Sequence, residues 1–241
     1  MTGSPIENDK RCSECLARGL CMARALIEPQ LSEWSGALTR ITVPQGQAII
    51  KEGAPLDKIY IVQMGCFLSH TSEYQKNSAV NIKNAGDLLG VGGIEKRRYP
   101  YTSVAAADCN VVCAIPYQKF LELLAGRPML IDCFASVMSR ELNKQTERVL
   151  MMKNTNAMQK LALFLVSTSD NLTARSMSGT DIKLLMSRAD IGDFLGITIE
   201  TVSRVFSQFE QFNILKITGK NLTILDLDGL RRVASGTFPV N

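Results

Sequence analysis

The sequence predicts an α+β fold: a β-rich region, then a long helix, then a mostly helical region that ends in a hairpin. Three observations predict it. Short apolar segments separated by glycine-bearing turns occupy residues 31–118, apolar residues recur at helical spacing from about Gly126 to Met152, and two helix patterns and a hairpin pattern follow. With 241 residues, 46% of them hydrophobic, the chain can bury one large core or two modest ones.

Composition narrows the class of protein. The net charge of +4 permits contact with phosphate groups without requiring it. A membrane span needs a run of ~18 apolar residues, and the sequence has no such run. Residues 1–10 lack the basic start and apolar stretch of a secretion signal. We therefore expect a cytoplasmic protein that does not enter the membrane.

Residues 1–30 form an arm with little periodicity that carries Cys12, Cys15 and Cys21 in C-x2-C-x5-C spacing. The chain has seven cysteines, an odd number, and no secretion signal, so a disulfide framework is not expected. Thiolates at this spacing can share one metal centre, and soft sulfur ligands select zinc, cuprous copper or an iron–sulfur cluster. The spacing alone fits a regulator, an electron carrier or a zinc module.

Residues 31–125 are expected to form a β-sandwich or barrel. Short apolar segments such as 58–62 are separated by turns with glycine, for example at Gly53, and this spacing of strands and turns is typical of such folds. The glycine-dense segment 85–93 could cradle a ligand, but glycines of this kind more often permit sharp turns between strands. We interpret it as turns.

Residues 126–153 are expected to form one long helix. Seven of its residues, three and four apart, make a narrow seam across three heptads. Charged side chains such as Arg140 and Glu141 flank this seam, which favours pairing with a second copy of the chain over packing on the helix's own domain. The seam predicted for this homodimer consists of Ile131, Phe134, Met138, Leu142, Gln145, Val149 and Met152.

Residues 154–241 are expected to form a second domain. A helix is predicted over 157–168 and a polar loop over 169–181. Ser187 with Asp190 three residues later is a helix-start signature, in which each side chain bonds to the other residue's backbone N–H.

A second short helix follows the first after a tight turn. Gly196 suits the end of the first helix, and Thr198 can cap the start of the second. Two short helices joined by such a turn form a helix-turn-helix. Glu200, Ser203 and Arg204 then lie side by side near the start of the second helix, where a recognition helix meets base edges of double-stranded DNA.

The segment after the second helix predicts a wing. It reads as two strands around Gly219 and Lys220, so that Lys220 can touch the phosphate backbone. We also assign Thr198 and Thr201, at the start of the recognition helix, to the DNA-binding surface.

The order of arm, β-rich domain, pairing helix and winged helix-turn-helix resembles the CRP/FNR transcription regulators over nearly the whole chain. Residues 196–204, Gly-Ile-Thr-Ile-Glu-Thr-Val-Ser-Arg, resemble the recognition segment of the FNR branch. The cysteine arm resembles that branch's cluster motif, and residues 111–116 resemble the stretch that supplies its fourth ligand. The resemblance implies a cyclic-nucleotide-binding-like β-roll as the fold of residues 31–125.

The resemblance also implies a function. Cys12, Cys15, Cys21 and Cys113 would hold a 4Fe–4S cluster that senses oxygen by controlling dimerisation. The recognition residues would read palindromic DNA sites of the TTGAT type, RNA polymerase would be a partner, and the protein would not be an enzyme. Cyclic nucleotide is not expected, because Tyr99-Pro100-Tyr101 separates Arg98 from Thr102 and Ser103, where nucleotide-binding relatives have an Arg-Ser or Arg-Thr pair.

Several alternatives stay open from the residues alone. Cys109 and Cys113 are four residues apart, so an unbroken strand would put both on one face, although Asp108 and Asn110 favour a turn at Cys109. Cysteine is often only a small buried hydrophobe, which is the simplest interpretation of Cys66, Cys109 and Cys133.

Other classes of protein compete with the cluster-bearing regulator. A structural zinc site or a thiol–disulfide switch could use the same arm on a regulator of this family. An iron–sulfur electron carrier or enzyme would have no use for the helix-turn-helix, and the phosphate-loop motif G-x4-G-K-[S/T] does not occur in the sequence.

Overall fold

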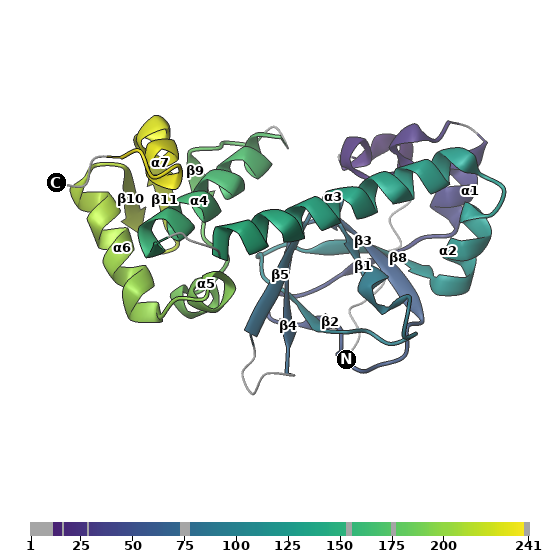
Figure 1. The fold of residues 1–241 in the computed structure, drawn as a ribbon. Helices are drawn as coiled ribbons and strands as arrows, with labels where there is room; N and C mark the ends of the chain where they lie inside the picture. The colour runs from purple at the N-terminus through teal and green to yellow at the C-terminus, as the bar shows by residue number, and fades with distance from the viewer. Residues whose placement is uncertain are drawn as a thin grey trace. The chain divides into compact units, whose positions relative to one another are not determined.

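The computed structural model describes residues 12–15, 17–27, 29–72, 78–152, 156–174 and 177–238 (Figure 1). The chain divides into two compact units, residues 1–143 and 144–241, and the long helix passes from one to the other. No helix in these described ranges is long and apolar enough to cross a membrane.

The first unit begins with the cysteine arm, which folds into three short 3-10 helices: η1 (Cys12–Glu14), η2 (Arg18–Leu20) and η3 (Met22–Ala25). A helix, α1 (Gln30–Gly36), follows and occupies the start of the region predicted as strands, so the prediction was wrong there. The physical reason is the spacing of Leu31 and Trp34, which lie three residues apart and bury one helical face at 3% and 0% exposure.

The β-rich prediction is confirmed for the rest of this region. In the described part of the unit, antiparallel pairing builds two four-stranded sheets, ordered β1-β8-β3-β6 and β2-β7-β4-β5, in a jelly-roll-like arrangement. The strands are β1 (Thr39–Thr42), β2 (Ala48–Ile50), β3 (Lys58–Met64), β4 (Cys66–Thr71), β5 (Ser78–Asn84), β6 (Leu88–Leu89), β7 (Thr102–Ala105) and β8 (Val111–Pro116).

The glycine-dense segment forms turns, as predicted. Gly86 and Gly90 have φ of +88° and +93°, a region that favours glycine, and the 3-10 helix η4 (Val91–Gly93) follows. Gly86 has a second role, because a Cβ there would lie 2.6 Å from Cβ of Leu20 in the arm. The turn therefore allows the arm to approach the sheet closely.

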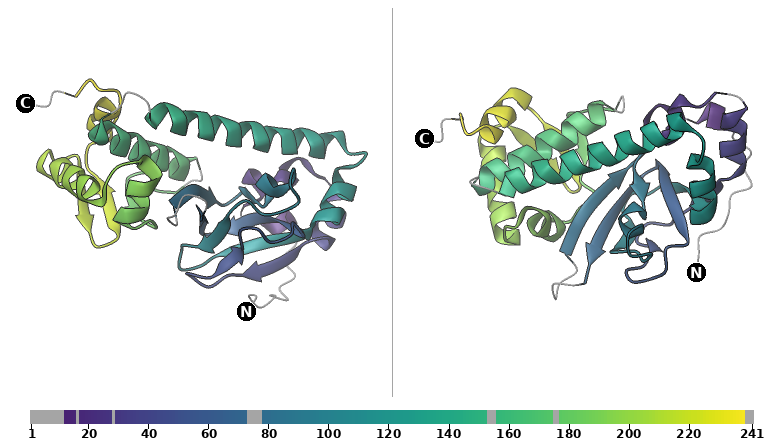
Figure 2. Two further views of the ribbon diagram at one scale, coloured as in Figure 1. Left: turned by 60° about the horizontal axis from the view of Figure 1, so that its bottom comes forward. Right: turned by 45° about the vertical axis from the view of Figure 1, so that its right-hand side comes forward.

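Two helices close the first unit. The short helix α2 (Tyr117–Leu124), which the sequence reading did not anticipate, ends before Gly126, and the predicted long helix follows as α3 (Pro128–Met152). The first half of α3 passes over the sheets of the first unit (Figure 2). One face of the helix lies on the core, where Leu130 and Val137 are 1% exposed.

The predicted seam divides between two faces of α3. Phe134 and Met138 pack against the core, and the Phe134 ring meets Phe120 edge-on with 5.7 Å between centroids. Ile131, Leu142 and Val149 are 51%, 69% and 53% exposed, and Gln145 is also exposed. The side chain of Met152 lies outside the described residues.

The second unit follows the predicted order of elements, with additions. It contains α4 (Ala157–Thr173), β9 (Asp181–Lys183), α5 (Arg188–Leu195), α6 (Ile199–Gln211), β10 (Leu215–Thr218), β11 (Asn221–Ile224) and α7 (Leu227–Ala234). The sequence reading missed β9, which pairs with β11 of the hairpin, and α7.

The polar loop predicted from Ser169 was wrong at its start, because α4 continues to Thr173. The polar side chains at this end of the helix bond to carbonyls one turn back instead of leaving it: Thr168 to Phe164 at 2.8 Å and Thr173 to Ser169 at 3.0 Å. Ser and Thr are compatible with a helix when they bond in this way.

Candidate functional site

The floor of a small pocket is formed by one sheet of the first unit. Cys113 of β8 pairs with Arg40 of β1 on one side and with Ile61 of β3 on the other. Residues directly opposite in antiparallel strands point to the same face of the sheet. Arg40 and Ile61 therefore flank the Cys113 side chain, and all three line the pocket.

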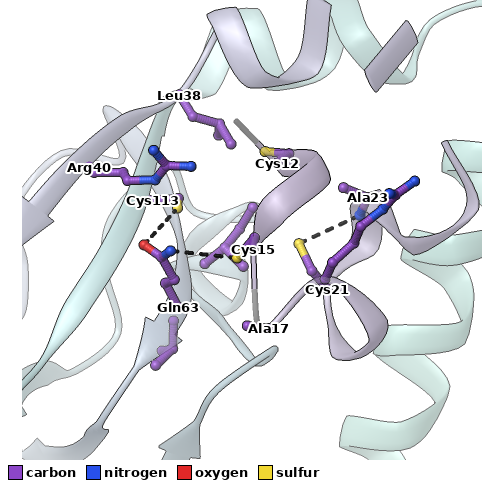
Figure 3. Close-up of a pocket in the computed structure, with 12 residues that line it drawn as sticks. Cys12, Cys15, Ala17, Cys21, Ala23, Leu38, Arg40, Gln63 and Cys113 are labelled. Atoms are coloured by element: carbon purple, nitrogen blue, oxygen red, sulfur yellow. Dashed lines mark hydrogen bonds between the residues drawn. The ribbon is translucent and has the colours of Figure 1, made fainter. Parts of the chain in front are cut away.

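The other wall of the pocket is the cysteine arm. Cys12, Cys15 and Cys21 line it together with Cys113, so the four predicted ligands are brought to one place (Figure 3). Two hydrogen bonds help to position these cysteines. The Cys12 backbone N–H donates to Oγ of Ser35 in α1 at 3.4 Å, and Sγ of Cys21 accepts from the backbone N–H of Ala23 at 3.5 Å.

Gln63 of β3 contacts thiols on both walls. Its Nε2 donates to Sγ of Cys15 at 3.5 Å, and its Oε1 accepts from Sγ of Cys113 at 3.9 Å (Figure 3). The sequence reading missed Gln63 and Arg40, because a single amide and a single cation carry no motif. The sequence offered one signal for Gln63: it lies two residues after Ile61, and residues two apart in a strand point to the same face of the sheet.

Burial dominates the electrostatics of this pocket. Burial is the main reason that the pKa of Cys21 is raised to about 11, and the neighbouring thiols of Cys12 and Cys15 act in the same direction. Burial also raises the pKa of Cys113 to about 12, although the charge of Arg40 acts in the opposite direction. At neutral pH these two thiols are therefore protonated unless a cation compensates the thiolates.

The donor set fits a soft metal centre or an iron–sulfur cluster. Four cysteine sulfurs are the usual ligands of such a cluster, and all the cysteines of the chain are free thiols. The cavity between the four measures about 20 Å³, room for roughly one water molecule. In the described ranges, no three His, Cys, Asp or Glu side chains are grouped closely enough to hold a metal ion, so the thiols must shift to bind one.

The other cysteines lie outside the pocket. Cys66 and Cys133 are buried at 3% and 4% exposure, as predicted for packing residues. Cys109 lies in the turn predicted by its neighbours, before β8 begins, and is exposed, so its interpretation as a buried residue was wrong. A turn residue outside β8 does not share the face of Cys113.

The arm also contacts the first half of α3. Arg24 donates to Oγ of Ser136 on α3 at 3.4 Å, and Glu33 of α1 forms an ion pair of 2.5 Å with Arg127, one residue before α3. Farther along α3, Glu141 forms a buried ion pair with Lys83 of β5. Movement of the arm is therefore mechanically linked to the helix with the predicted seam.

The helix-turn-helix of the second unit forms as its caps predict. Ser187 and Asp190 form a reciprocal capping box at α5, Gly196 ends that helix with φ of +65°, and the Thr198 hydroxyl accepts from the Thr201 N–H at 3.3 Å. The sequence reading missed Gly192, where a Cβ would lie 2.7 Å from the carbonyl oxygen of Ile197. Only glycine lets α5 and the turn approach so closely.

The recognition helix α6 has a buried stripe and an open face. Val202, Val205, Phe206 and Phe209 are at most 2% exposed. On the open face, Glu200 and Arg204 are exposed and Ser203 is half-buried, one helical turn apart. The pKa of Glu200 is lowered because its own backbone N–H and the Thr198 hydroxyl donate to its carboxylate.

The wing and a neighbouring cation complete this surface. β10 and β11 meet at Gly219, with φ of +63°, and Lys220 at the tip is exposed. Arg188, at the start of α5, is also exposed and stacks over the Phe206 ring, with 5.2 Å from its guanidinium carbon to the ring centroid. The arrangement places hydrogen-bonding side chains and cations on one surface, as contact with a nucleic acid requires.

Two family models match the chain. One is the Crp-like helix-turn-helix domain, over residues 159–233, and the other is the cyclic nucleotide-binding domain, over residues 40–127. These two regions correspond to the helix-turn-helix unit and to the strands that carry the pocket floor.

The chain is similar to named regulators along most of its length. The fumarate and nitrate reduction regulatory protein of Vibrio cholerae is 32% identical over 225 residues, which is 92% of this chain and 90% of that protein. The corresponding protein of Escherichia coli is 30% identical over 94% of this chain and 91% of its own. The anaerobic regulatory protein of Haemophilus influenzae is 31% identical over 91% of this chain and 86% of its own.

Solved structures share the fold. FixK2 from Bradyrhizobium japonicum has a TM-score of 0.72 at 21% identity and covers 85% of this chain and 98% of its own. TTHA1359 from Thermus thermophilus, a transcriptional regulator, has a TM-score of 0.64 at 18% identity and covers 81% and 98%. With the relatives above, the chain belongs to the CRP/FNR family and is a DNA-binding transcription regulator of the FNR type.

Proposed function

We propose that this chain is an oxygen-responsive, homodimeric regulator in which Cys12, Cys15, Cys21 and Cys113 hold a 4Fe–4S cluster. The observation that carries the proposal is the pocket in which three thiols of the arm face one thiol of the sheet. When bound, such a cluster supplies iron that reacts with molecular oxygen. Its presence can therefore report the absence of oxygen.

The arm's own contacts supply a route from the pocket to α3. When thiolates from separate segments bind one metal centre, the free energy of binding also stabilises the folded arrangement of those segments. Binding would therefore hold the arm against the sheet. An ordered arm keeps the Arg24–Ser136 hydrogen bond and the Glu33–Arg127 ion pair at the start of α3. A released arm loses both contacts.

Pairing of two α3 helices is the proposed output. Ile131, Leu142 and Val149 are exposed apolar side chains on this helix, and pairing would remove them from water. A dimer places two recognition helices about one DNA turn (~34 Å) apart, so that a palindrome is read. A change of ~1.4 kcal/mol in pairing free energy changes occupancy about tenfold when binding is far from saturation.

The proposed DNA sites are palindromes of the TTGAT type. Arg204 can donate two hydrogen bonds to guanine, Glu200 can accept from the amino group of cytosine, and Ser203 can do either. Thr198, Thr201 and Lys220 would contact the backbone at the rim of this surface. We further propose cytoplasmic RNA polymerase as the partner of the DNA-bound dimer.

Cyclic nucleotide is not part of the proposal, although one matching family model is a cyclic nucleotide-binding domain. The polar groups near the glycine-rich turns are engaged within the chain. Arg98 donates to the Gly53 carbonyl at 2.7 Å, Arg97 stacks over Tyr117, and the Ser103 hydroxyl bonds to Ser69 at 2.9 Å while fully buried.

The test is an anaerobic purification followed by an absorption spectrum and quantitation of iron, sulfide and zinc. The proposal predicts a brown protein with about four iron and four sulfide per chain. A colourless protein with one zinc per chain would indicate a structural zinc site. A colourless, metal-free protein that forms disulfides with oxidant would indicate a thiol switch.

A further inference from the structure

Gln63 joins the two walls of the cysteine pocket. One amide group contacts a thiol of the arm, Cys15, through Nε2 at 3.5 Å and a thiol of the sheet, Cys113, through Oε1 at 3.9 Å (Figure 3). The amide offers both a donor and an acceptor, so it can bridge two thiols, each of which can donate or accept.

The position of Gln63 in its strand explains why it reaches both thiols. The pairing of β3 with β8 is irregular between Val62 and Met64, where Gln63 lies. Bulges of this kind bend a strand and change the direction of a side chain, and they are frequent beside functional sites. Gln63 is half-buried and lines the pocket, so its amide is partly shielded from water.

The end of the arm is held mainly by packing. Met22, Ala23 and Leu26, after the last arm cysteine, are buried in the core at 0%, 2% and 4% exposure. Cys15 lies between η1 and η2 and is half-buried. Gln63 supplies its side-chain hydrogen bond to the sheet.

The bridge belongs to the thiol form of the pocket. A metal-bound thiolate has no proton to donate, so Cys113 can donate to Oε1 only as a thiol.

From this geometry we infer that Gln63 is a positioning residue, which docks Cys15 on Cys113 in the iron-free chain and so holds the ligands together before a cluster is loaded. Its role in loading rests on the proposed cluster function, whereas the docking itself does not. Preorganised ligands bind faster and more tightly because less order is lost on binding. Gln63 is thus expected to affect how closely the arm is held to the sheet and how fast a cluster is taken up, although it is not itself a ligand.

Thiol labelling of the iron-free, reduced protein tests the docking. With iodoacetamide and mass spectrometry, Gln63→Leu is expected to raise the labelling rates of Cys15 and Cys113 roughly fivefold, the change that the loss of about one hydrogen bond produces. The matched control is Gln45→Leu, which removes another amide hydrogen bond, to the Ala106 carbonyl, outside the pocket. It should leave both rates unchanged.

The other cysteines provide internal references in the same experiment. Exposed Cys109 reports reagent activity, and buried Cys66 and Cys133 report global unfolding. If Gln63→Leu exposes Cys66 and Cys133, that variant is unfolded and Gln63→Glu replaces it in the experiment. Glutamate keeps the size and polarity of the side chain but cannot donate a hydrogen bond to Cys15. Unchanged labelling of Cys15 in the variant that stays folded would overturn the inference.

A second measurement separates this inference from the proposed function. Ferrous iron and sulfide are added anaerobically, and the absorbance of the cluster is followed with time. Gln63→Leu should take up the cluster several times more slowly than the natural chain. Gln45→Leu should take it up as fast as the natural chain. Equal rates for all three would overturn the role of Gln63 in loading and leave the cluster function standing. If the natural chain takes up no cluster, the cluster function and the loading role fail, and labelling alone decides the docking.

Discussion

The cysteine pocket and the helix-turn-helix are built in opposite ways. The pocket draws residues from the arm, β1, β3 and β8, which are far apart in the chain. The helix-turn-helix and its hairpin occupy one continuous segment, from Ser187 to Ile224, with local caps at both helices. The pocket therefore exists only when the whole first unit is folded, whereas the DNA-binding surface is specified by neighbouring residues.

This difference predicts different responses to substitution. A site that needs four ligands from separate segments should fail as a whole when one is lost. A surface of side chains along one helix should lose affinity in steps, one contact at a time. Substitutions in each region test this contrast.

Replacing the sheet cysteine should have the largest effect. Cys113→Ser removes the thiol that the sheet contributes to the pocket, so cluster loading should be abolished, as measured by iron content and absorbance under nitrogen. Cys109→Ser is the matched control, because Cys109 is exposed and outside the pocket. Loss of the cluster in the control, with retention in Cys113→Ser, would move the fourth ligand.

Breaking the predicted seam should have the next largest effect. Leu142 is 69% exposed on α3, and Leu142→Glu places a charge where two helices are proposed to meet. We expect a monomer in sedimentation and a loss of roughly 100-fold or more in operator affinity, because simultaneous binding to two half-sites is lost. Asn143→Glu adds the same charge at the adjacent exposed position and should stay dimeric. A dimeric Leu142→Glu variant would show that α3 pairs through another face.

Removing one recognition side chain should have a graded effect. Arg204→Ala is expected to cost ~1–3 kcal/mol of binding free energy and to relax discrimination at one base position, measured by fluorescence anisotropy on a series of single-base variants of the operator. Lys220→Ala should instead weaken binding to all sequences alike and reduce the salt dependence. If Arg204→Ala also weakens all sequences alike, Arg204 contacts phosphate.

Substitution of one glycine in each region should have the most local effect. A Cβ at Gly86 would meet the arm at Leu20, and a Cβ at Gly192 would meet the Ile197 carbonyl. We expect Gly86→Ala and Gly192→Ala each to cost ~1–3 kcal/mol of local stability, the first in the arm and the second in the helix-turn-helix, measured by hydrogen exchange of each segment. Gly36→Ala, where a Cβ would meet nothing within 4 Å, should have no such cost. Spread of either effect to the other unit would contradict the separation of the two regions.

The same contrast explains what the sequence could predict. The helix-turn-helix was readable from Ser187, Gly196 and Thr198, because capping residues act on their immediate neighbours. The strands and the long helix were readable from their periodicity. The fourth thiol came from a family resemblance, since spacing alone left Cys109 and Cys113 as alternatives.

The remaining features depend on tertiary contacts that leave no local pattern. Gln63 and Arg40 reach the pocket because β1 and β3 lie on either side of β8. The end of α4 was missed because its polar residues are satisfied by carbonyls one turn back rather than by a loop. Gly192 is indistinguishable by composition from any other helical glycine until the turn packs against it.

The central claim is that binding of iron by the pocket controls pairing of the chain. The most direct measurement is sedimentation of the anaerobic protein with iron quantified in the same sample, repeated after exposure to air. The account predicts a dimer with about four iron per chain before exposure, and a monomer depleted of iron after it. A monomer that retains its full iron content, or a dimer that persists unchanged once the iron is gone, would contradict the account.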